Sequence, residues 1–168
     1  MKVMNRPACQ QFANDPQVAS KIPCGVEHTW DRRASNSVNL VFIDAGVEDK
    51  EILLNGLLPG YRAIVLSANQ DGVEQITHLL PESKDLESLY SVSHGAPGIL
   101  CLGTSQLSFC TIDRYRLSLQ KWADALAADA QILLYSWRMA EGTDGLTFVH
   151  QFHEIVRRAI AAEHFVKV

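Results

Sequence analysis

The sequence lacks the features that mark several large classes of protein. No stretch approaches the roughly 20 consecutive apolar residues of a membrane span, and the first residues contain no apolar run of the length that a signal peptide needs. No basic stripe stands out among 15 Lys and Arg and 19 Asp and Glu, which argues against a dedicated nucleic-acid binder. No GxGxxG and no phosphate-loop lysine occur, so nucleotide binding has little support.

Cysteine is scarce and shows no spacing typical of a metal site. The four cysteines, Cys9, Cys24, Cys101 and Cys110, include no CxxC pair, so we expect no zinc and no other cofactor. Cys101 lies in an apolar run, where we expect a buried structural thiol. A reduced compartment is therefore the default expectation, and the cytoplasm is the default location.

What is present suffices for one folded domain. The chain has 168 residues, of which 47% are hydrophobic and 20% are charged, a composition typical of a globular protein with a sizeable core. Residues 1–37 lack clear periodicity, and we expect them to form a loosely ordered leader. We expect residues 38–168 to form a single α/β domain.

From residue 38 on, short apolar runs alternate with helical patterns. This alternation predicts a three-layer sandwich, with a mostly parallel sheet and helices on both faces. We expect strands at 38–43, 63–66, 88–92 and 130–135, a hairpin within 96–108, and helices at 48–58, 71–80, 113–126 and around Phe148, Phe152 and Ile155.

Residues able to carry chemistry follow the expected strands. In an open parallel sheet, ligands bind beyond the carboxyl ends of the strands. His94 would be held there by the scaffold and open to a ligand, and the N–H of Gly95 could face a developing oxyanion. The residues also allow a plainer interpretation, in which His94 only hydrogen-bonds its neighbours. The expected strand ends carry Asp44, Ser67, Ser93, His94, Gly95, Ser136 and Trp137.

Two blocks of the sequence resemble the domain-of-unknown-function 4347 family over about residues 38–162. The first is the run 90–98, which contains Ser93-His94-Gly95, and the second is Leu133-Leu134-Tyr135. Further matches are Asp44, Asp71-Gly72, Leu102-Gly103, Ala140, Gly142 and Gly145. The family is found mostly near the N-termini of large bacterial surface and adhesin-like proteins. The resemblance therefore implies an exported surface protein, as an alternative to the default cytoplasmic location.

The two blocks are also similar to those of caspase-like cysteine peptidases. That resemblance implies a histidine general base at His94 and a cysteine nucleophile on the neighbouring strand end. We expect Asp44, Asp71, Ser93 and Ser136 to line the pocket around them. A histidine beside a thiol favours the attacking thiolate.

This chain departs from the pattern at the nucleophile. Ser136 replaces the usual glycine, and Trp137 replaces the cysteine. Indole has no nucleophilic atom of use and is much larger than a thiol. We therefore expect the site to be inactive and partly filled by the Trp137 side chain. The side chain of Ser136 is expected to point to the opposite face of the sheet, because it lies one position earlier on an extended strand.

We therefore expect a non-catalytic, degenerate member of the family, a pseudoenzyme that acts as a binding or structural module of a bacterial surface protein. The expected partner is a protein or peptide, with no cofactor, no metal, no nucleic acid and no membrane span. Two alternatives stay open. One is a cysteine-peptidase-like hydrolase that uses His94 with an unconventional nucleophile, and the other is a flavodoxin-like small-molecule binder.

Removal of residues 1–37 is predicted to cost little stability, because this segment has no periodic apolar face and should bury little area. Thermal melts of the full chain and of a chain that starts at Ser37 should agree within a few degrees. A large drop in melting temperature would show that Phe12 or Trp30 packs against the core.

Overall fold

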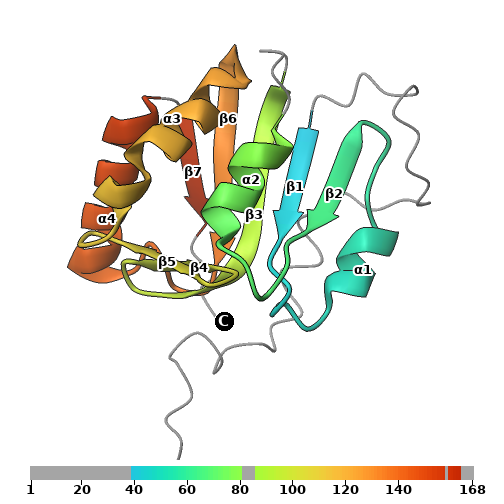
Figure 1. Ribbon diagram of the computed structural model, residues 1–168, viewed down its shortest axis with the longest axis horizontal. Helices are drawn as coiled ribbons and strands as arrows, with labels where there is room; N and C mark the ends of the chain where they lie inside the picture. The colour runs from blue at the N-terminus through green and yellow to red at the C-terminus, as the bar shows by residue number, and fades with distance from the viewer. Residues whose placement is uncertain (1–38, 81–85, 158, 164–168) are drawn as a thin grey trace, which may run out of the picture.

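The computed structural model describes residues 39–80, 86–157 and 159–163, which form an α/β fold. The expected leader lies outside the described residues. The strands are β1 (Asn39–Ile43), β2 (Tyr61–Val65), β3 (Leu86–Ala96), β4 (Ile99–Leu102), β5 (Ser105–Ser108), β6 (Leu126–Ser136) and β7 (Ala159–Glu163). The helices are α1 (Lys50–Asn55), α2 (Gly72–Leu79), the 3-10 helix η2 (Ile112–Tyr115), α3 (Arg116–Asp124) and α4 (Gly142–Val156) (Figure 1).

The described strands form one mixed, seven-stranded sheet. Strands β2, β1, β3, β6 and β7 pair in this order, and all these pairs are parallel. β3 then continues beyond the parallel ladder and pairs antiparallel with β4, which pairs antiparallel with β5. The α/β class is as expected, but the structure does not support a mostly parallel three-layer sandwich, because the chain turns back after β3 instead of crossing over through a helix.

The turn between β3 and β4 sets this change of direction. Ala96 pairs with Ile99, so only two residues connect the strands, and the second of them is Gly98. Its φ of +72° lies in the left-handed region that glycine adopts readily, and a Cβ there would lie 2.9 Å from the carbonyl oxygen of Asp144. The N–H of Gly98 donates to the carbonyl of Met139 at 2.9 Å, which ties the turn to the loop before α4.

Two apolar clusters lie on opposite faces of the parallel ladder. The larger joins the sheet to α2, α3 and α4, and the smaller joins the other face to α1. Alternate residues of β1 divide between them: Phe42 belongs to the larger cluster, and Val41 and Ile43 to the smaller. Burial on both faces explains why this strand reads as a continuous apolar run in the sequence.

Two parts of the chain differ from the expected elements. Leu126, expected within a helix, begins β6 and is buried. β7 was not expected at all, and it pairs in parallel with β6 from Gln131 onward. α4 ends before it at Arg157, which has a left-handed φ of 49° and donates its N–H to the carbonyl of His153 at 2.7 Å. The alanines of β7 are poor strand formers, so the local pattern did not predict a strand there.

Replacement of Thr77 tests how α2 is held to α3. The buried indole of Trp122 donates from Nε1 to Thr77 Oγ1 at 2.9 Å. Thr77→Val keeps the shape of the side chain but removes this acceptor, so the free energy of unfolding should fall by about 1–3 kcal/mol. Thr77→Ser keeps a hydroxyl and should cost less. Urea titrations compare the two variants, and equal stability of both would contradict the prediction.

Candidate functional site

Three neighbouring strand ends gather the residues that the sequence singled out. β3 lies between β1 and β6, and Ser93 of β3 stands opposite Ser136 of β6. Asp44 follows β1 directly, and its N–H donates to the carbonyl of Val92 at 2.9 Å. The strand ends that carry Asp44, His94 and Ser136 therefore lie side by side, at the edge of the sheet where β4 and β5 also lie (Figure 1).

The imidazole of His94 is half-buried and hydrogen-bonded through one nitrogen. Its Nε2 lies 2.6 Å from the carbonyl oxygen of Gly46. A carbonyl oxygen only accepts, so Nε2 carries a proton and donates. In the neutral ring, Nδ1 then holds the lone pair, and no described residue hydrogen-bonds to it. The histidine can therefore accept a proton or a hydrogen bond at Nδ1.

Asp44 is buried with both carboxylate oxygens hydrogen-bonded to backbone N–H groups. Oδ1 accepts from Gly46 at 2.8 Å, and Oδ2 accepts from Gly103 at 2.6 Å. Gly103 lies in the turn between β4 and β5, where its φ is +56°. These two bonds compensate the carboxylate for the water that it loses on burial. Asp44 thus fastens the loop after β1 to the β4–β5 turn.

Gly95 is required by the packing of β3 against its neighbours. A Cβ at this position would lie 2.2 Å from Ser136 Oγ and 2.4 Å from the carbonyl oxygen of Ile99. Side chains alternate along a strand, so Gly95 and His94 face opposite sides. The Ser136 hydroxyl therefore lies on the side of the sheet away from the imidazole, where it is buried and has no hydrogen-bond partner among the described residues.

Trp137 lies on the same side of the sheet as His94. It follows β6 and packs against the smaller apolar cluster, which includes Val92 and Tyr135. Val92 precedes His94 by two residues, so the two side chains share a face. An indole thus stands at the strand end next to the histidine, where the caspase-like resemblance implies a thiol.

The side chains of Asp71 and Ser93 form hydrogen bonds to groups other than the imidazole. Asp71 Oδ1 accepts from the N–H of Glu74 at 3.1 Å as the N-cap of α2, and Oδ2 accepts from the hydroxyl of Tyr115 at 2.7 Å. Burial, together with this hydrogen bond, raises the pKa of Tyr115 to about 12. Ser93 Oγ donates to the carbonyl of His94 at 3.2 Å.

Of the two cysteines around the hairpin, Cys101 stands nearer to the histidine in the sheet. It is directly opposite His94 in the β3–β4 pair, and such residues lie on one face with Cβ atoms about 4.5–5.5 Å apart. Cys101 is buried as expected, but the expectation of a thiol is wrong, because this cysteine is disulfide-bonded. Cys110 is exposed and free, in the turn after β5.

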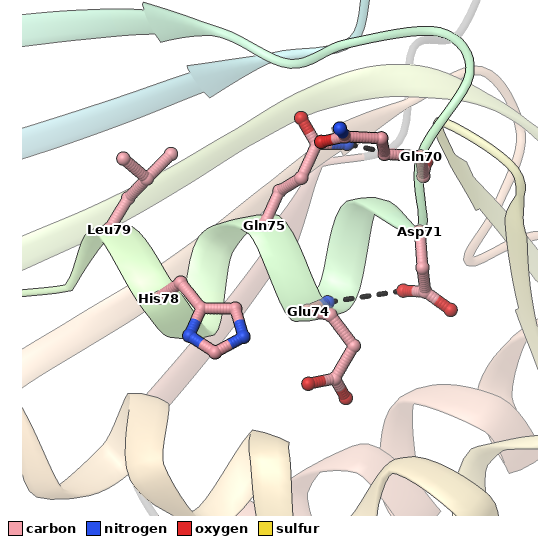
Figure 2. A pocket seen from close by; sticks show the side chains of 6 residues that line it. All are labelled: Gln70, Asp71, Glu74, Gln75, His78 and Leu79. Atoms are coloured by element: carbon pink, nitrogen blue, oxygen red, sulfur yellow. Dashed lines mark hydrogen bonds between the residues drawn. The ribbon is translucent and has the colours of Figure 1, made fainter.

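A pocket of about 350 Å³ lies along α2 and not at the strand ends. Its polar groups hold α2 in place: Glu74 accepts from the Ser118 hydroxyl at 2.7 Å, and Gln75 accepts from the N–H of Ser67 at 2.7 Å. It is also not the strand-end crevice that a flavodoxin-like binder uses, so we assign it no function. Figure 2 shows the side chains that line it: Gln70, Asp71, Glu74, Gln75, His78 and Leu79.

Neither a metal centre nor a membrane span is found in the part of the chain that the structure describes. No three His, Cys, Asp or Glu side chains among these residues gather where they could hold a metal ion. No helix there is long and apolar enough to cross a membrane. The pair His150 and His153 is exposed on α4, and His153 Nδ1 lies 3.8 Å from a carboxylate oxygen of Glu154.

Two glycines complete the site although sequence patterns did not assign them a role in it. Gly46 supplies the carbonyl that holds His94, and Gly103 supplies an N–H to Asp44. One local signal existed for Gly46, because an aspartate often accepts from the backbone N–H two residues later. No local signal pairs Asp44 with Gly103, which lies 59 residues away.

A family model matches most of the chain. The family is described as domain of unknown function (DUF4347), and its match covers residues 40–166. The matched span includes the three strand ends and both turns that surround His94. A search of curated proteins found no match.

Replacement of Gly95 tests the close packing at the site. Gly95→Ala should lower the free energy of unfolding by about 1–3 kcal/mol, because its Cβ would overlap Ser136 Oγ and the Ile99 carbonyl. Combining it with Ser136→Gly removes the first overlap and leaves the second, so stability should recover in part. Chemical denaturation measures both variants against Ser136→Gly alone. A fully stable Gly95→Ala variant would show that β4 and β6 pack less closely than described.

Proposed function

The chain belongs to the DUF4347 family, and from this premise we propose that it is a non-catalytic, caspase-like member that acts as a binding module of a bacterial surface or adhesin-type protein. One observation carries this proposal: the strand end beside His94 offers no nucleophile. Trp137 stands there, and the hydroxyl of Ser136 lies on the other side of the sheet. Cys101 stands opposite His94 but is disulfide-bonded, and a general base without a free nucleophile in reach performs no covalent catalysis.

The geometry of His94 supports a role in recognition. The imidazole is held at a rigid strand end by the Gly46 carbonyl, and its Nδ1 has no hydrogen bond to any described residue. A fixed acceptor of this kind suits a donor on a partner, such as a backbone N–H of a protein or peptide. Pre-organisation by the scaffold reduces the entropy lost on binding. The proposed ligand is therefore a protein or peptide segment that donates a hydrogen bond to Nδ1.

Restoring the missing thiol tests the caspase-like layout. In the variant Trp137→Cys with Ser136→Gly, the imidazole of His94 should lower the pKa of the new thiol below its usual value of about 8.5. Iodoacetamide at pH 6 should then alkylate this new thiol faster than the exposed Cys110, and His94→Ala should abolish the difference. Mass spectrometry of the labelled peptides measures both rates.

The control is the unmodified chain, in which the proposal expects no alkylation that depends on His94. A folded double variant whose new thiol reacts no faster than Cys110 would mean that His94 does not face this position. The caspase-like reading would then lose its support, and membership of the family would remain.

One observation favours a second candidate, a cysteine-peptidase-like hydrolase with an unconventional nucleophile. Cys101 stands opposite His94 in the sheet. Because Cys101 is disulfide-bonded, this function requires a dithiol reductant that first converts it to a thiol. The alkylation assay separates the two functions: after reduction, rapid labelling of Cys101 that His94→Ala abolishes supports the hydrolase, and slow labelling that is indifferent to His94 supports the binding module. Cys101→Ser is the matched control.

A further inference from the structure

We propose that Asp44 is a positioning residue for His94, which it controls through the backbone of Gly46. It would also couple the imidazole to the β4–β5 turn. This role rests on the proposed function only in treating His94 as the group that meets the ligand.

Gly46 links the carboxylate of Asp44 to the imidazole of His94. Asp44 Oδ1 accepts the N–H of Gly46 at 2.8 Å, and the carbonyl of Gly46 accepts from His94 Nε2 at 2.6 Å. One residue therefore joins the buried carboxylate to the imidazole by its two backbone groups. A change in the position of Gly46 must alter the direction in which its carbonyl points.

Gly46 fits tightly between the side chains of Asp44 and His94. A Cβ on this glycine would lie 3.0 Å from Asp44 Oδ1, 3.2 Å from His94 Cδ2 and 3.4 Å from His94 Nε2. Carboxylate and imidazole thus flank the same residue. Because the space is filled, the orientation of Gly46 depends on both neighbours.

The other carboxylate oxygen of Asp44 is bonded to the turn between β4 and β5. Asp44 Oδ2 accepts the N–H of Gly103 at 2.6 Å, and the next N–H in that turn, of Thr104, donates to the carbonyl of Gln70 at 2.9 Å. The turn is thereby fixed to the start of α2 as well. Displacement of the β4–β5 turn by a ligand would pull on Asp44 and, through Gly46, on His94.

One charged side chain, that of Lys50 at the start of α1, hydrogen-bonds to the loop that contains Gly46. Its Nζ donates to the carbonyl oxygens of Ala45 and Val47, at 3.4 Å each, and not to Asp44. Among the described residues, the Asp44 carboxylate accepts from two backbone N–H groups, of Gly46 in the same loop and of Gly103 in the β4–β5 turn. Backbone hydrogen bonds therefore stabilise this carboxylate, so an amide at this position is a sharp test.

The test is Asp44→Asn, read by the imidazole nitrogen signals of His94 in ¹⁵N-labelled protein. The amide keeps one acceptor oxygen but turns an NH₂ group toward the second N–H, so Gly46 or Gly103 loses its partner. In the unmodified protein, we expect a single tautomer with a proton on Nε2 that exchanges slowly with water. In Asp44→Asn, this proton should exchange roughly tenfold faster, the effect of losing one hydrogen bond.

The matched control is Asp71→Asn, which alters another carboxylate that accepts a backbone N–H and a second donor. It should lower stability without changing the His94 signal, whereas a merely structural Asp44 would behave in the same way as Asp71. A folded Asp44→Asn with the normal Nε2 proton overturns the proposal. If Asp44→Asn does not fold, Gly46→Ala provides the second variant, since its contacts require shifts of only a few tenths of an ångström. Normal proton exchange in Gly46→Ala likewise overturns the proposal. None of these signals depends on ligand binding or thiol chemistry, so failure of this proposal is distinguishable from failure of the proposed function.

Discussion

The buried carboxylate of Asp44 holds together segments that are far apart in the sequence. It accepts the N–H groups of Gly46 and Gly103, and a buried charge without such partners would be costly. Through these bonds, the loop after β1 and the turn between β4 and β5 keep a defined position beside the end of β3. The imidazole of His94 is fixed relative to this loop, because its Nε2 is hydrogen-bonded to the carbonyl of Gly46.

Close backbone contacts allow this arrangement, and glycine makes them possible. A Cβ on Gly72 would lie 2.5 Å from the carbonyl carbon of Leu102, and one on Gly103 would lie 2.2 Å from the carbonyl oxygen of Gln70. The start of α2 and the β4–β5 turn therefore meet backbone to backbone. Gly95 likewise lies close to the backbone carbonyl of Ile99, and it also lies against the side chain of Ser136. Glycines that the resemblance groups with a catalytic pattern thus have a packing role that is independent of catalysis.

The site retains a positioned histidine and has a tryptophan beside it. Trp137 packs with the apolar cluster on the α1 face of the sheet, so this side chain contributes to the core as well as occupying the strand end. Side-chain alternation removes Ser136 from the imidazole. These two facts together favour recognition over hydrolysis. The alternative function, a hydrolase, draws its support from the position of Cys101 opposite His94 in the sheet.

Local patterns predicted the parts of the fold that depend on local physics. The apolar run that contains Val41 and Phe42 identified a buried strand, and the helical pattern at 71–80 identified α2. Alternation along a strand also predicted that Ser136 faces away from His94. The hairpin expected within 96–108 is formed by β4 and β5. β7 was missed because its alanines carry little strand preference, and the antiparallel pairing of β3 with β4 across Gly98 was not predicted.

The sequence by itself determined the α/β class, the family and the strand-end positions of Asp44 and His94, because strand burial and turn chemistry act over a few residues. Only the tertiary structure decided that Gly46 holds the imidazole, that Gly103 holds the carboxylate and that Cys101 stands opposite His94. These pairings join residues that are remote along the chain or set by strand register. Periodicity carries no information on such contacts, since they form only when the segments pack against one another.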